Sequence, residues 1–236
     1  MSDEFFVGYL KTPPETARRM RRAAAVIVLF GAVMATALAI ATGPFDRAAY
    51  EWSTEREWRG ALSAAPVPVL VAENGQAFPL VTQGKHGAAP AIAGNDRAAV
   101  RLAGRRIVRD GTTMIELVPG TIERLTPTLP AAAKIDDLGP ARLSGEIVDS
   151  KCFLGVMNPG RLEVHRACAK RCIAGGIPPM LFTHDREGRE LHLLLVDANG
   201  RPVNDRVLPL VARPVTLEGR LERRDGLRYL YVTRWE

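Results

Sequence analysis

The sequence predicts a mainly β protein, in which two small barrels in tandem follow one membrane-spanning helix. Three observations lead to this prediction: an uncharged apolar run near the N-terminus, a hairpin pattern that occurs twice, and a short strand pattern before each copy. The chain has 236 residues, of which 47% are hydrophobic and 25% charged, and this suits two small globular domains.

The apolar run AAAVIVLFGAVMATALAIATG, residues 23–43, is predicted to be a transmembrane helix. As a helix it would be roughly 30 Å long, which matches the hydrocarbon thickness of a bilayer. Lys11 and four arginines precede the run, whereas one early cation, Arg47, follows it. The positive-inside rule therefore places residues 1–22 in the cytoplasm and the rest of the chain across the membrane.

A cleaved signal peptide is the alternative for this run, because ALA at residues 37–39 has the pattern of a cleavage site. The cationic segment before the run is long, and the run itself exceeds the usual length for such a peptide. We therefore expect a retained anchor and a single-pass protein.

The two barrels are predicted from a duplicated hairpin pattern. VRLAGRRIVRDG at 100–111 and VTLEGRLERRDG at 215–226 align without a gap as V-x-L-x-G-R-x-x-x-R-D-G. Apolar residues alternate before each Asp-Gly pair and continue after it, which is typical of a β-hairpin with a tight turn. LVAENG at 70–75 and LVDANG at 195–200 form a second matching pair. Two matches in the same order indicate duplicated domains.

Each unit also begins with a short strand, EWRGALS at 57–63 and ARLSGEIVDS at 141–150. Roughly five short strands per unit fit a small closed barrel, for which the OB-fold is a common host. We expect OB-like barrels over residues 55–125 and 141–236. Residues 126–140, TPTLPAAAKIDDLGP, contain three prolines without periodicity and are expected to be a linker.

The second unit carries an insertion that the first lacks. Gly60 and Leu70 are ten positions apart, whereas the matching Gly145 and Leu195 are fifty apart. All three cysteines of the chain lie in or at the edge of this insertion, at about residues 149–181. Function is therefore expected in the insertion rather than in the barrel scaffold.

The insertion predicts a cluster of three cysteines and one histidine. RLEVHRACAKRCIAGG is expected to form a short helix that ends at its two glycines, before a pair of prolines. On this helix His165, Cys168 and Cys172 share one face. Cys152, at the end of a strand, would meet them if the helix folds back over the barrel.

Three interpretations of this cluster remain open. Its donors suit Zn(II) or Cu(I). A disulfide from Cys152 to Cys168 or Cys172 would attach the insertion to the barrel, and an exported protein favours such bonds. The third interpretation is a reactive redox thiol, because neighbouring cations lower thiol pKa values. The cations expected to do so are Arg166, Lys170 and Arg171.

The odd number of cysteines keeps a metal site among these interpretations. The Cys-x-x-x-Cys spacing with a histidine resembles copper-handling sites, such as those of cytochrome oxidase assembly proteins and the dicopper electron-transfer centre. That resemblance covers the spacing alone, since those proteins have other folds.

Several other functions are disfavoured. The formal net charge is +6, but aromatic residues make up only 6% and are scattered, which does not suit nucleic-acid binding. The sequence lacks the motifs of covalent haem attachment, iron–sulfur ligation, phosphate-binding loops and common hydrolases. The glycine-rich QGKHGAA at 83–89 is expected to be a surface turn. The sequence thus favours a protein without catalytic turnover, while leaving a thiol enzyme open.

The segment GEIVDSKC…HRACAKRCIAGGIPP resembles a loose group of exported bacterial proteins with a VDSKC strand and a CAxxC helix on an OB-like barrel. Forms with an N-terminal anchor like EFFVGYLKTPP are associated with bacterial respiratory membrane complexes and their quinol- or molybdenum-dependent oxidoreductases. The residues that the resemblance marks are Asp149, Cys152, His165, Cys168 and Cys172.

The resemblance implies an accessory or assembly subunit of a respiratory electron-transfer complex, anchored in the cytoplasmic membrane with its barrels in the periplasm. Its partners would be the membrane and an integral-membrane or periplasmic redox complex. The alternatives are a copper- or zinc-binding protein that delivers or senses metal, and a membrane-tethered thiol oxidoreductase.

Overall fold

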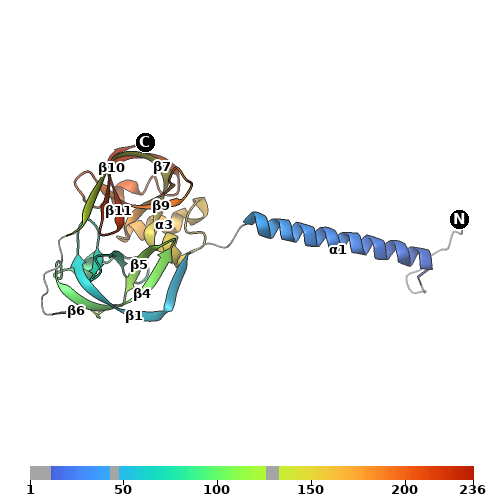
Figure 1. The fold of residues 1–236 in the computed structure, drawn as a ribbon, viewed down its shortest axis with the longest axis horizontal. Coiled ribbons are helices and arrows are strands. Elements are labelled where there is room, and N and C mark those ends of the chain that lie inside the picture. The colour runs from blue at the N-terminus through green and yellow to red at the C-terminus, as the bar shows by residue number, and fades with distance from the viewer. Residues whose placement is uncertain (1–11, 43–47, 126–132) are drawn as a thin grey trace. The chain divides into compact units, whose positions relative to one another are not determined.

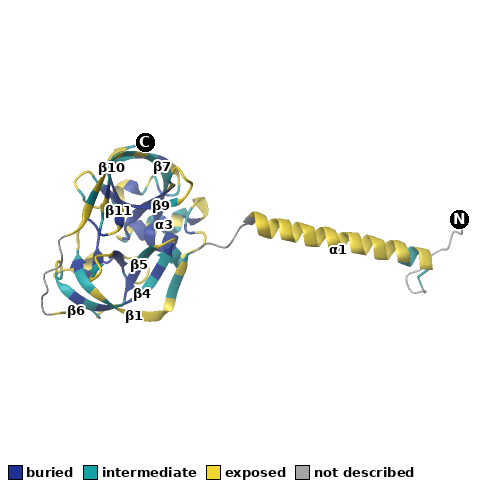
Figure 2. Ribbon diagram, viewed as in Figure 1, coloured by how far each residue is buried: buried dark blue, intermediate teal, exposed yellow. Residues whose placement is uncertain are grey.

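The computed structural model describes residues 12–42, 48–125 and 133–236, and the chain divides into two units, Met1–Asp46 and Arg47–Glu236. The first unit holds helix α1 (Pro14–Thr42), and the strands that the described residues form lie in the second unit (Figure 1). Most residues of α1 are exposed (Figure 2). Its length and composition suffice to cross a membrane, as expected, and fit either an anchor or a signal sequence.

The C-terminal half of the second unit is a closed five-stranded barrel with the order β10-β11-β9-β8-β7. β9 and β11 are parallel, and the other neighbours are antiparallel. The strands are β7 (Ile135–Asp149), β8 (Pro179–His184), β9 (Glu190–Asp197), β10 (Pro214–Arg224) and β11 (Leu227–Trp235). The prediction of a mainly β protein with a small closed barrel is confirmed for this half.

The N-terminal half forms a six-stranded sheet with the order β1-β2-β3-β5-β4-β6, in which β1 also pairs with β4. β3 and β5 are parallel, as are β9 and β11 in the other half. The short helix α2 (Ala89–Ile92) follows β3. The strands are β1 (Ala49–Ser63), β2 (Val69–Ala72), β3 (Ala77–Val81), β4 (Ala99–Arg109), β5 (Thr112–Leu117) and β6 (Glu123–Arg124).

The two expected Asp-Gly hairpins are present, as β4–β5 and β10–β11. Each turns at a pair of residues with positive φ, namely Asp110 (42°) with Gly111 (79°) and Asp225 (48°) with Gly226 (86°). Two positive φ values in a row define the tight turn that Asp-Gly favours, because its twist matches that of the strands.

Strand β7 begins earlier than the sequence indicates. It starts at Ile135, inside the segment expected to be a linker, because its first residues pair with the end of β10. Asp136 lies opposite Arg223, and the Arg223 guanidinium donates to the Asp136 carboxylate at 3.0 Å. The rest of that expected linker, 126–132, lies outside the described residues.

The two halves pack against each other through a shared apolar core. Ile107 and Met114 of the first half and Phe153 and Met180 of the second belong to one buried cluster. Two further clusters lie within the barrel and within the N-terminal sheet. The halves therefore form a single compact unit, with buried residues between them (Figure 2).

The insertion between β7 and β8 supplies much of this junction. It contains the short helical turns η1 (Cys152–Val156) and η2 (Glu163–His165) and the helix α3 (Arg166–Ala174). The expected cysteine-bearing helix is thus present, and Gly175 follows its last residue as predicted. η1 contacts β1, β4 and β5 of the first half, so the insertion lies between the two sheets.

Candidate functional site

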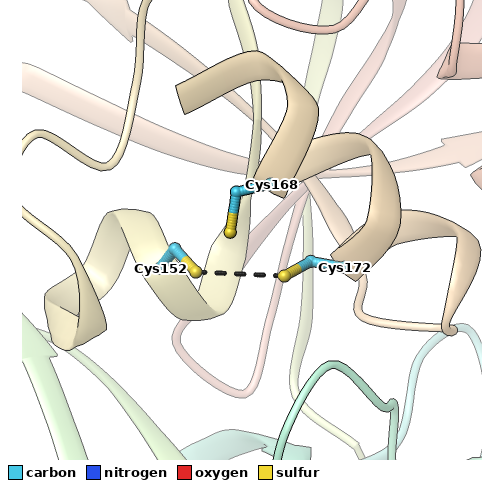
Figure 3. A group of neighbouring side chains, drawn as sticks. All are labelled: Cys152, Cys168 and Cys172. Carbon is cyan, nitrogen blue, oxygen red and sulfur yellow. Dashed lines mark hydrogen bonds between the residues drawn. The ribbon is translucent and has the colours of Figure 1, made fainter. Parts of the chain in front are cut away.

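The structure brings the three cysteines together, although they come from two separate segments. Cys152 begins η1, directly after β7, whereas Cys168 and Cys172 lie on α3. Their sulfur atoms all lie within 4.8 Å of one another, and Cys152 and Cys172 are 3.9 Å apart (Figure 3). Cys152 and Cys172 are buried, and Cys168 is half-buried. The predicted return of the helix to Cys152 is therefore observed.

This spacing suits a shared metal ion. Two sulfur atoms that each lie about 2.3 Å from one ion are roughly 3.8–4.0 Å apart in tetrahedral or trigonal geometry. The Cys152–Cys172 separation of 3.9 Å falls in that range. The three-cysteine centre, which is the name used below for Cys152, Cys168 and Cys172, can thus accept an ion with little movement of these two thiols.

The disulfide interpretation differs from what the structure shows. All three thiols are free, and the 3.9 Å between Cys152 and Cys172 is about twice the length of a sulfur–sulfur bond. The bond expected from Cys152 to Cys168 or Cys172 is therefore not formed.

His165 lies beside Cys152 rather than at the centre of the three sulfurs. Its ring, its neighbour Asp149 and Cys152 form a second group of potential ligands, all buried. His165 Nε2 is 3.1 Å from Asp149 Oδ2, and Asp149 Oδ1 accepts the backbone N–H of Cys152 at 2.8 Å. The predicted four-donor set is thus divided into two groups that share Cys152, and Asp149 connects them.

The cation at the cysteines comes from the other half of the molecule. Lys85, in the loop after β3, donates from Nζ to Cys168 Sγ at 2.7 Å and lies 3.7 Å from Cys172 Sγ. Of the cations expected from the sequence, Arg166 instead bonds Glu163 at 2.9 Å. The sequence did not predict a role for Lys85, because its glycine-rich loop has the composition of a surface turn. Its place beside the cysteines depends on the packing of this loop against the distant insertion.

Two sets of contacts hold the Lys85 loop against the insertion. Lys151 Nζ donates to the carbonyls of Thr82 and Gly84 at 2.8 and 2.9 Å. The N–H of Gly87 donates to the carbonyl of Gly175 at 2.9 Å. A Cβ atom at Gly175 would lie 1.8 Å from the Lys85 carbonyl oxygen, so this approach requires glycine. The glycine pair after α3 therefore serves the docking of the loop as well as the helix end.

The environment separates the pKa values of two of the thiols. The pKa of Cys172 is lowered to about 7, first because the Cys152 thiol donates to its sulfur and further because Lys85 is nearby. The pKa of Cys152 is raised, by that same hydrogen bond, by burial and by the charge of Asp149. With a pKa of about 7, Cys172 is about half thiolate at neutral pH, and thiolate is the form that binds metal or attacks a disulfide.

No protein family, curated protein or solved structure matches the chain.

Proposed function

We propose that this protein is a membrane-anchored accessory or assembly protein of an electron-transfer complex, whose three-cysteine centre binds a thiophilic metal ion. The observation that carries the metal-binding part is the convergence of three free sulfur atoms within 4.8 Å. Soft thiolates favour Cu(I) and Zn(II) over the hard cations. All three sulfurs come from the insertion between β7 and β8, and the first half contributes the Lys85 ammonium beside them.

The architecture supports an accessory role. Helix α1 can serve as the anchor, and the apolar helix with its preceding arginines supports a cytoplasmic N-terminus and a periplasmic second unit. The resemblance of the cysteine segment to proteins of respiratory membrane complexes supports a redox complex as the partner.

A tandem pair of OB-like barrels is part of this proposal. In each half the first strand pairs with the second and fourth, and the third is parallel to the fifth. Gly104 in β4 and Gly219 in β10 occupy the same place in the duplicated pattern, and each closely approaches the neighbouring strand. This correspondence supports duplication of one ancestral barrel, with the insertion added to the second copy.

The test is the metal content of the full chain, purified in mild detergent under reducing, anaerobic conditions. We expect one equivalent of Cu(I) or Zn(II) per chain, and loss of most of the affinity in Cys152→Ser, Cys168→Ser and Cys172→Ser. His184→Ala is the control, because His184 is exposed at the end of β8. Failure of both ions to bind, with three titratable thiols, would contradict the proposal.

The partner is tested separately. A mild-detergent extract containing the tagged full chain should yield an integral-membrane or periplasmic redox protein by mass spectrometry. Recovery of the chain alone after chemical cross-linking in the membrane would contradict the accessory role, while leaving metal binding intact.

A thiol oxidoreductase is the second candidate function. It is favoured by the 3.9 Å separation of Cys152 and Cys172, because a small movement would allow a sulfur–sulfur bond. Reduction of a disulfide substrate would oxidise this pair, with the two electrons passing to the substrate as two thiols form. A reversible disulfide found by peptide mapping, together with turnover that is supported by an added dithiol reductant and abolished in Cys152→Ser, would favour this function over metal binding.

A further inference from the structure

The three-cysteine centre provides three sulfur donors and no other. Among the described residues, the Cys, His, Asp and Glu atoms that gather around Cys168 and Cys172 are those three sulfurs. His165 belongs to the neighbouring group, where its Nε2 meets Asp149. Zn(II) in structural sites almost always takes four ligands, whereas Cu(I) is satisfied by soft sulfur donors and accepts a lower coordination number.

Lys85 adds a positive charge next to these sulfurs. Its Nζ is 2.7 Å from Cys168 Sγ and 3.7 Å from Cys172 Sγ. Three thiolates with Cu(I) carry a net charge of about −2, and with Zn(II) about −1, so a nearby ammonium stabilises the copper-loaded centre about twice as strongly. A lysine at this position therefore discriminates between the two ions by charge.

The position of Lys85 is fixed by buried groups. The loop that carries it accepts two hydrogen bonds from Lys151, whose ammonium also pairs with Glu116 Oε2 at 2.5 Å, and both side chains are 4% exposed. On the other side, Gly87 bonds Gly175 at the end of α3. These contacts between the two halves hold the Lys85 ammonium beside the sulfurs.

We infer that the three-cysteine centre is a three-sulfur site for Cu(I), and that Lys85 determines its preference for Cu(I) over Zn(II). This inference rests on the proposed metal-binding function and names the ion and the residue that selects it. Because Lys85 itself is exposed, solvent and salt screen its charge, and we expect its removal to change the preference by about tenfold.

The experiment compares Cu(I) and Zn(II), each supplied as the metal alone with a competing chelator, on the full chain in detergent without oxygen. X-ray absorption at the bound metal gives the number and type of ligands. The variants are Lys85→Met and Lys85→Arg, with Lys170→Met as the matched control on α3. Thermal unfolding shows whether each variant folds, and Lys85→Gln replaces Lys85→Met if that variant does not.

We expect three sulfur neighbours around Cu(I) in the unaltered protein, and a copper-to-zinc affinity ratio that falls about tenfold in Lys85→Met. The ratio should be kept in Lys85→Arg and in Lys170→Met, because both retain a cation beside the sulfurs. A nitrogen or oxygen ligand on copper, or an unchanged ratio in folded Lys85→Met, overturns the inference and leaves metal binding standing. If the unaltered protein binds neither ion, the proposed function fails as well.

Discussion

The pKa values of the Cys152 and Cys172 thiols are shifted in opposite directions, although these residues are neighbours in the same buried cluster. A single S–H donated from Cys152 stabilises the thiolate of Cys172, and Lys85 adds a favourable charge. The pKa of Cys152 is instead raised, by this same hydrogen bond, by its burial and by the nearby Asp149 carboxylate. Which of the two thiols has the lower pKa therefore depends on how the side chains are placed, and the residue types alone do not predict it.

The metal-free, reduced protein should show one thiolate that forms near neutral pH. Because the pKa of Cys172 is lowered to about 7, its thiolate is present above that pH and is lost as the pH falls through it. Thiolate absorbance in the ultraviolet measures this titration. Cys172→Ser should remove the step, and Cys152→Ala should move it to higher pH because the donor is gone. A step near pH 7 that persists in Cys172→Ser would assign the thiolate to another cysteine.

Lys151 is a buried cation whose loss should be costly. Its ammonium pairs with Glu116 Oε2 and donates to two part-buried carbonyls of the Lys85 loop, so Lys151→Met removes the donor from all three acceptors. Glu116 Oε1 still accepts from Tyr50 and Arg105. Removing one member of a buried ion pair costs about 3 kcal/mol or more. We expect urea unfolding to show a loss of this size, and a change below about 0.5 kcal/mol in Arg171→Met, because Arg171 is exposed on α3. Equal stability of the two variants would contradict the buried pairing.

Among the helices, strands and turns, short sequence patterns predicted those features that depend on neighbouring residues. The Asp-Gly turns, the alternating strands around them and the helix that ends at Gly175 all follow from short-range rules, and all are present. The early start of β7 depends on pairing with β10, and the Lys85 loop depends on packing against α3. Contacts between residues far apart in sequence leave no mark in local composition, so these two features could not be predicted.

The contact between α3 and the Lys85 loop should be sensitive to one methyl group. In Gly175→Ala the added Cβ would meet the Lys85 carbonyl oxygen at 1.8 Å, so the loop must move away from the helix end. Such overpacking costs about 1–3 kcal/mol. We expect that loss in urea unfolding, together with a lower copper-to-zinc affinity ratio, because Lys85 moves with its loop. Ala174→Ser, at the adjacent exposed position, should change neither quantity.

The apolar core that joins the two halves of the second unit also contains Cys152 and Cys172 of the candidate site. Phe153 is completely buried in the core that the halves share, and it contacts Phe182 of the barrel and the guanidinium of Arg109 from the first half. Arg109 Nε also donates to the Phe153 carbonyl at 2.8 Å. Neither half can separate from the other without exposing this residue, which predicts that they unfold together.

Cooperative unfolding of the second unit can be followed from two tryptophans, one in each half. Trp58 lies in β1 and Trp235 in β11, and the third tryptophan, Trp52, is exposed in β1 and is replaced in both variants. Variants that then keep only Trp58 or only Trp235 report on each half. We expect coincident urea transitions from the two reporters, because the shared core couples the halves. Phe153→Ala should lower the free energy of unfolding by about 3–5 kcal/mol and shift both urea midpoints down together. Val164→Ala, at an exposed site, should leave both midpoints unchanged. Two separate transitions in the unaltered protein would show that the halves are independent domains, and the junction would then be too weak to hold Lys85 against the sulfurs.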